Sequence, residues 1–188
     1  IGSQILTHYP DNVDTARTIT TQEARLDIRQ SEAIHVPDLA KDLLEQISFE
    51  ARESEYVDTK SGVSARMSIT AFENLISTAE RRILISGDST TSIRMSDFMG
   101  VITAINGKIE LVYEGEQEGP YQVAMNLLDK AVRSQFANYF PNPEVLKKRM
   151  RPKNVEEPSR DENPYRSIIN WFDKGNQVNL FFNTKDDD

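Results

Sequence analysis

Apolar residues recur at steps of three and four along two long stretches of the chain. The first runs from Pro37 to Glu53 and predicts an amphipathic helix, with Pro37 at a position that a first helical turn tolerates well. The second begins after Ser64, ends at Gly87-Asp88 and predicts the strongest helix of the sequence. Its apolar stripe consists of Ala65, Ile69, Phe72, Ile76, Ala79 and Ile83, widened by Leu75 and Leu84.

Further helices are expected on both sides of this pair. Asp11 to Ala33 reads as two helical pieces, the first capped by Asp11 or Asn12. Thr20 or Thr21 is expected to cap the second piece, with Glu23 completing a capping box on Thr20. Downstream we predict a short helix from Met95 to Ile105, and a longer helix that Pro120 opens and Phe140-Pro141 stops. The apolar face of that longer helix holds Val123, Leu127, Leu128, Ala131, Val132 and Phe136.

Strand signals are few. Lys108 to Glu114 alternates polar and apolar side chains, which suits a half-buried strand or a helix end. Val178 to Phe182 is typical of a terminal strand, and Lys108 to Glu114 is its candidate partner, since a lone strand is unstable. The fold class predicted is therefore mainly α, with a small β element.

The C-terminal part of the chain changes character along its length. A short helix is predicted from Pro143 to Met150. Residues 151–163 are rich in charge and proline and predict a flexible linker. Apolar side chains then return between Tyr165 and Phe172, where we predict a compact helix.

Composition narrows the classes of function. The 188 residues are 38% hydrophobic and 28% charged, as in an ordinary globular protein. The net charge of −8 argues against broad, nonspecific nucleic-acid binding. No apolar run is long enough to cross a bilayer, no signal-peptide pattern opens the chain and cysteine is absent, so we expect a cytoplasmic protein.

Motifs of catalysis and metal binding are mostly missing. A phosphate-binding P-loop needs a Gly-Lys pair followed by Ser or Thr, but Gly107-Lys108 is followed by Ile109, so we expect no ATP hydrolysis by this chain alone. His8 and His35 lack zinc-binding spacing, and no GxSxG elbow is present. We expect both histidines to be surface or hydrogen-bonded residues.

Basic residues raise two alternatives. The cluster at residues 147–153 is either the solvated end of a helix or a patch for nucleic acid or an acidic partner. Arg81, Arg82 and Arg94 are either ordinary solvent-facing arginines or residues at a subunit interface, where the planar guanidinium pairs well with carboxylates.

Arg66 is a cation at an electrostatically unfavourable position. It lies in the first turn of the helix that follows Ser64, where the helix dipole favours anions rather than cations. One hypothesis is that Arg66 contacts a phosphate. The alternative is an exposed arginine, or one paired with Asp58 or Glu73.

Several segments resemble one family. Residues 56–82 (YVDTKSGVSARMSITAFENLISTAERR), 94–98 (RMSDF) and 107–116 (GKIELVYEGE) are similar to the C-terminal part of bacterial magnesium-chelatase subunit I-like AAA+ ATPases, which are relatives of the MoxR group. IGSQILTHYP at residues 1–10 resembles the segment that follows the arginine-finger region of these proteins, and NPYRSIINWFDKG at 163–175 resembles their distal part less specifically. GVSAR, at residues 62–66, is the most specific match.

The resemblance implies a helical lid bundle and a role for Arg66 as the sensor-2 arginine that reaches the γ-phosphate of ATP, with Gly62 and Ser64 shaping the turn before it. It implies that residues 1–35 end the AAA+ core, that 36–115 form the lid, and that 116–188 form a helical extension. The P-loop, the Walker B acids and the arginine finger would lie upstream of Ile1.

The longer protein would bind ATP and Mg²⁺, whereas this chain alone would hold neither tightly. Implied partners are other subunits of an AAA+ ring and a client protein that is remodelled; we expect no membrane and no nucleic-acid partner. An alternative from another class is a helical adaptor or transcription-regulator module without a nucleotide.

Overall fold

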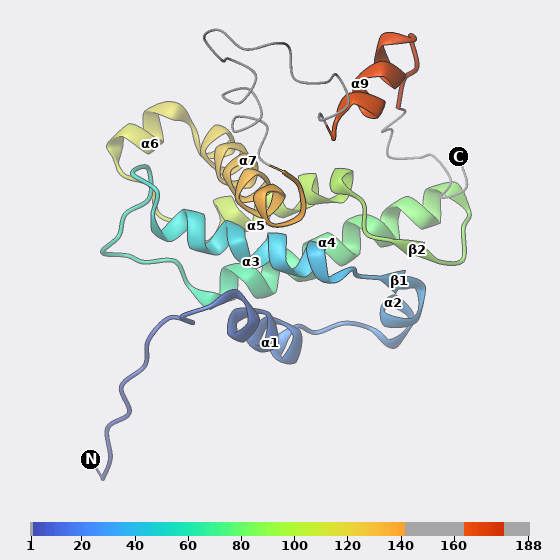
Figure 1. Ribbon diagram of the computed structural model, residues 1–188. Coiled ribbons are helices and arrows are strands. Elements are labelled where there is room, and N and C mark those ends of the chain that lie inside the picture. Colours follow the sequence, from blue (N-terminus) through green and yellow to red (C-terminus); the bar gives the residue numbers. More distant parts are fainter. Residues whose placement is uncertain (1, 142–163, 179–188) are drawn as a thin grey trace, which may run out of the picture. The chain divides into compact units, whose positions relative to one another are not determined.

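The computed structural model describes residues 2–141 and 164–178, and the chain is mainly helical, as predicted (Figure 1). Two compact units are distinguished, one that runs to Gln135 and one that begins at Phe136. The division predicted at residues 35 and 115 refers to regions of a longer protein and stays a prediction.

The first unit is built around the long helix α4 (Ala65–Ser86), which packs against α1, α3, η1 and α5. Its ends lie where the sequence placed them. Ser64 accepts a hydrogen bond from the backbone N–H of Arg66, and Gly87 ends the helix in a left-handed conformation that glycine adopts without a steric penalty. The other elements of the bundle are α1 (Val13–Glu23), α3 (Asp38–Arg52), η1 (Met95–Gly100) and α5 (Val101–Asn106).

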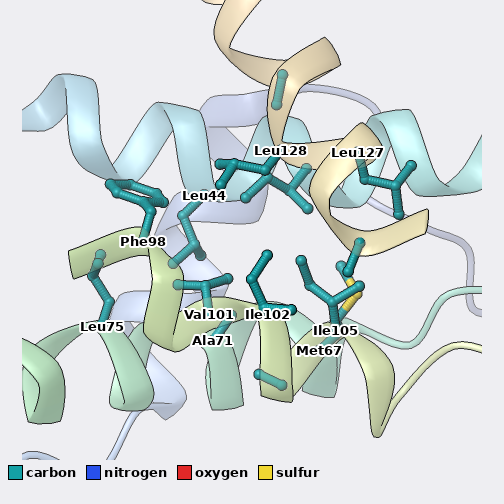
Figure 2. Close-up of a cluster of buried hydrophobic side chains, with 14 of the residues drawn as sticks. Leu44, Met67, Ala71, Leu75, Phe98, Val101, Ile102, Ile105, Leu127 and Leu128 are labelled. Carbon is teal, nitrogen blue, oxygen red and sulfur yellow. The ribbon is translucent and has the colours of Figure 1, made fainter. Parts of the chain in front are cut away.

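The hydrophobic core lies between α3, α4, α5 and the helix α7 (Pro120–Tyr139), as Figure 2 shows. Leu44 of α3 and Leu75 of α4 are almost fully buried there, together with Ile105 of α5 and Leu127 of α7. The periodicity of α4 identified most of its buried face, but Leu84 is 77% exposed and does not widen that face. The reason is geometric, because Leu84 follows the buried Ile83 by about 100° around the helix.

The N-terminal helices differ from the prediction in one cap. Asn12 caps α1, as expected, but α1 continues to Glu23 instead of breaking at Thr20 or Thr21. The second piece is α2 (Ile28–Ala33), which Asp27 caps in a capping box with Gln30. Thr20 is buried and lies beside Glu45 of α3. Its hydroxyl therefore serves tertiary packing rather than a cap.

Among the described residues, the paired strands lie elsewhere than predicted. Two-residue strands β1 (Ile34–His35) and β2 (Thr91–Ser92) pair in parallel. Within Lys108 to Glu114, only Leu111 forms a bridge, to Val57, and α6 (Tyr113–Glu118) begins inside that segment. Residues 179–182 of the predicted terminal strand lie outside the described residues.

The second unit includes the last turn of α7 and the helix α9 (Arg166–Asp173), which confirms the helix predicted around Tyr165 to Phe172. Phe136 stacks on Phe140 with ring centroids 4.6 Å apart, and Tyr165 donates a hydrogen bond to the carbonyl of Pro141. The helix predicted at Pro143 to Met150, the linker at 151–163 and the basic cluster at 147–153 lie outside the described residues.

Candidate functional site

The turn that leads into α4 is fixed by Asp58. The carboxylate of Asp58 accepts hydrogen bonds from the Lys60 N–H at 2.9 Å and from the Ser61 hydroxyl at 3.0 Å. The backbone N–H bond from Lys60, followed by the Ser61 bond, lowers the pKa of Asp58. The Ser61 hydroxyl also lies within hydrogen-bond distance of the Glu110 carboxylate. Since one hydroxyl carries one proton, Ser61 can donate to only one of these two carboxylates at a time.

Gly62 brings this turn against the N-terminal segment. Its φ of +69° lies in the left-handed region that favours glycine, and a Cβ at this position would lie 2.2 Å from Oη of Tyr9. The guanidinium of Arg52 lies 4.4 Å from the centroid of the Tyr9 ring, a cation–π contact. Burial lowers the pKa of Arg52. Tyr9 therefore joins the turn to the end of α3.

Arg66 follows this turn as the second residue of α4, and its side chain is exposed. Among the described residues, no carboxylate forms an ion pair with it. The two acids considered as partners of Arg66 form other hydrogen bonds. Asp58 accepts hydrogen bonds within its own turn, and Glu73 accepts the backbone N–H of Arg25 at 2.9 Å. The acid-paired alternative is thus wrong for the described part of the chain, and the exposed guanidinium remains open to an anion.

The helix end itself is partly satisfied. The Ser64 hydroxyl oxygen lies 3.2 Å from the N–H of Arg66, and the Ser64 carbonyl accepts the N–H of Met67 at 2.8 Å. These bonds occupy two of the amides that a helix start offers to an anion. An anion at this end would consequently depend mainly on the guanidinium of Arg66. An arginine stays protonated, so this side chain can bind and orient an anion but cannot transfer a proton.

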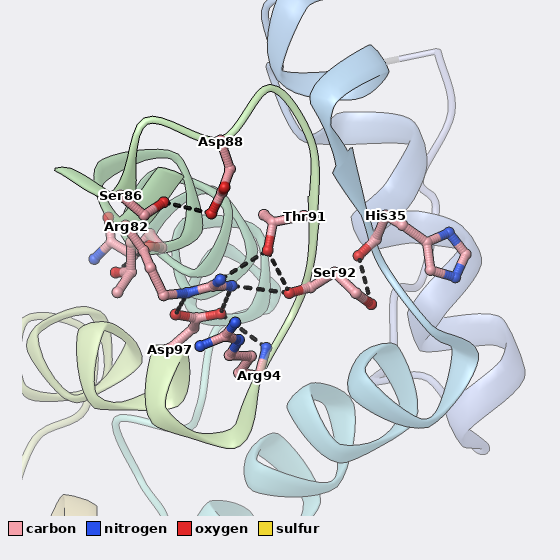
Figure 3. Close-up of polar contacts among 10 residues, drawn as sticks. His35, Arg82, Ser86, Asp88, Thr91, Ser92, Arg94 and Asp97 are labelled. Carbon is pink, nitrogen blue, oxygen red and sulfur yellow. Dashed lines mark hydrogen bonds and ion pairs between the residues drawn. The ribbon is translucent and has the colours of Figure 1, made fainter. Parts of the chain in front are cut away.

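Arg81 and Arg82 lie in different environments, and Figure 3 shows that of Arg82. Arg82 is buried, contrary to the solvent-facing interpretation, and its guanidinium pairs with Asp97 at 3.0 Å. It also donates to the Thr91 hydroxyl at 2.7 Å and to the Ser92 carbonyl at 2.8 Å. Arg81 is exposed. Arg82 lies seven residues after the buried Leu75, which places it on the same face of α4. This spacing is the sequence signal that indicates an inward-facing side chain.

The histidines do not assemble a metal site in the described part of the chain, where no group of three or more His, Cys, Asp or Glu residues could hold an ion. The Nδ1 atom of His8 lies 2.7 Å from the Tyr9 carbonyl, and His35 is exposed on β1. For the same described residues, none of the helices combines the length and apolar character needed to span a membrane.

Comparison of the chain with models of known protein families matches no family, and comparisons with curated proteins and with solved structures give no match. The resemblance to AAA+ ATPases therefore depends on the sequence segments quoted above.

Proposed function

We propose that this chain is the helical lid and C-terminal region of a magnesium-chelatase-like AAA+ ATPase, whose ATP hydrolysis remodels a partner protein. The observation that supports the proposal best is Arg66, an exposed cation at the start of α4 that pairs with no carboxylate of the described residues. Its place as the last residue of GVSAR is the place of the sensor-2 arginine in the family that the sequence resembles.

The residues present fit a phosphate. The planar guanidinium of Arg66 can donate two parallel hydrogen bonds to phosphate oxygens, and charge-assisted bonds of this kind are about twice as strong as neutral ones. The dipole of a 22-residue helix adds positive potential at the same end. ATP with Mg²⁺ would be held by the ATPase core upstream and would supply the γ-phosphate.

The fold offers a way to convert this contact into motion. α4 contributes to the core along its length, so a force on Arg66 acts on the whole helical unit rather than on a loop. The entering segment meets the same turn through Tyr9 and Gly62. Loss of the γ-phosphate contact after hydrolysis would release the lid at this point.

The test is Arg66→Ala in the longer protein, with Arg25→Ala as the matched control because Arg25 is also an exposed arginine. We expect Arg66→Ala to reduce ATP hydrolysis strongly while Arg25→Ala leaves it unchanged. If the Arg66→Ala protein hydrolyses ATP at the wild-type rate, Arg66 is not a nucleotide sensor.

A further inference from the structure

A groove lies on the C-terminal half of α4, where η1 and α5 pack beside it. Its volume is about 420 Å³, within the range of pockets that bind ligands. The residues that matter for its chemistry are Ser77, Thr78, Arg81, Met99, Gly100 and Thr103. It is separate from the turn before Arg66 because it begins more than two helical turns further along α4.

Close packing of η1 on α4 forms the floor of this groove. A Cβ on Gly100 would lie 2.0 Å from Oγ1 of Thr78, so only glycine permits this approach. The Thr78 hydroxyl donates to the Asn74 carbonyl at 2.8 Å, and the Thr103 hydroxyl donates to the Gly100 carbonyl at 3.1 Å. Asn74 also lines the groove, and its amide donates to the Thr103 hydroxyl at 3.2 Å, so the polar side chains of the floor already have partners.

Two polar groups on the wall remain for a ligand. Ser77 and Arg81 are exposed and lie four residues apart, on one face of α4. In the part of the chain that the structure describes, their side chains make no hydrogen bond or ion pair. Met99, 38% exposed, supplies an apolar surface beside them. The groove thus combines one cation, one hydroxyl and one apolar wall.

This combination favours a single carboxylate with an aliphatic neighbour. A guanidinium pairs bidentately with a carboxylate, and a flexible methionine adapts to aliphatic side chains of different shape. A polyanion such as nucleic acid is disfavoured by the net charge of −8. The groove is open to solvent, so an extended peptide segment covers it better than a small molecule does.

We propose that this groove is a docking site for an extended segment of a partner protein that carries a single Asp or Glu, with its carboxylate on Arg81 and Ser77 and a neighbouring aliphatic side chain against Met99. The proposal goes beyond the nucleotide role of Arg66 and does not depend on it.

The test uses the whole chain labelled with ¹⁵N and titrated with the peptide acetyl-Ala-Leu-Glu-Leu-Ala-amide. We expect saturable shifts in the amide signals of Ser77, Met99 and Thr103. Replacing Glu by Gln in the peptide, or Arg81 by Gln in the protein, should weaken binding about fivefold, the range of a partly exposed ion pair.

Two further variants make the result decisive. Ser77→Trp should fill the groove and abolish binding while leaving Arg81 in place, with circular dichroism to verify the fold. Arg25→Gln, which removes an exposed arginine outside the groove, should bind like wild type. Shifts that lie elsewhere, that survive Arg81→Gln, or that sodium acetate reproduces with equal affinity would overturn the proposal.

Discussion

The buried pair of Arg82 and Asp97 allows a sharp test of what holds the loop after α4. The side chains are 2% and 0% exposed, and two bonds join them, from Nε to Oδ1 at 3.2 Å and from Nη2 to Oδ2 at 3.0 Å. Asp97 also accepts the backbone N–H of Arg94 at 2.8 Å, and Arg82 holds Thr91 of β2. The pair therefore ties η1 and β2 to α4.

Replacing Arg82 by Met leaves the Asp97 charge buried without its cation. Breaking a buried ion pair from one side costs about 3 to 5 kcal/mol, a large share of the 5 to 15 kcal/mol that stabilises a typical protein. Asp97→Asn should also destabilise the wild-type protein, because charge-assisted bonds are lost. In the Arg82→Met background the same change should instead stabilise the protein, since it removes the unpaired charge, and the coupling energy between the two changes should be about 0.5 to 3 kcal/mol.

The assay is urea unfolding of the four proteins of this cycle, with Arg81→Met as the control on the exposed neighbour. We expect the midpoint of Arg82→Met to fall by roughly 2 M urea, given a typical dependence on denaturant, and that of Arg81→Met to move little. Equal effects of Asp97→Asn in both backgrounds would refute the reasoning, because they would show that the two side chains are not coupled.

Two other expectations concern the buried acid and the glycine turn. Burial raises the pKa of Glu45, so its ionised form destabilises the folded chain at a pH above the folded pKa. Glu45→Gln removes this charge and should therefore stabilise the protein at pH 7. The gain should become smaller as the pH falls toward 4, because Glu45 is then protonated in the folded chain. A gain in urea midpoint that is the same at both pH values would contradict this. Gly62→Ala should lower the free energy of unfolding more than Gly87→Ala does, since both glycines have positive φ but only Gly62 faces Tyr9. The difference between the two variants should shrink in a Tyr9→Ala background. Equal unfolding free energies of the two variants would count against the Tyr9 contact.

Local chemistry explains which elements the sequence could predict. The helix starts at Asn12, Pro37 and Ser64, and the stop at Gly87, depend on neighbours within a turn, so the residues themselves carry the signal. Long apolar periodicity likewise located α4 and its core face. The location of Arg66 at a capped helix start was predictable for the same reason.

Long-range contacts explain the rest. Thr20 has the chemistry of a cap, but it lies inside α1 and its side chain is buried beside Glu45 of α3. Two-residue strands are too short to leave an alternating pattern, so the pairing of Ile34 with Thr91 had no sequence signal. Asp97, as the partner of Arg82, is fifteen residues away and follows no spacing rule. Sequence alone could not show that Arg66 forms no ion pair with Asp58 or Glu73. It could not show the groove beside Arg81 either, because both depend on the three-dimensional structure.

The most direct test of the central proposal is the preference of the longer protein for ATP over ADP, measured by calorimetry with wild type and Arg66→Ala. If Arg66 contacts the γ-phosphate, its loss should weaken ATP binding by about 1.5 to 3 kcal/mol, roughly 10- to 150-fold, and leave ADP binding nearly unchanged. An unchanged ratio of the two affinities would contradict the assignment of Arg66 as a γ-phosphate sensor.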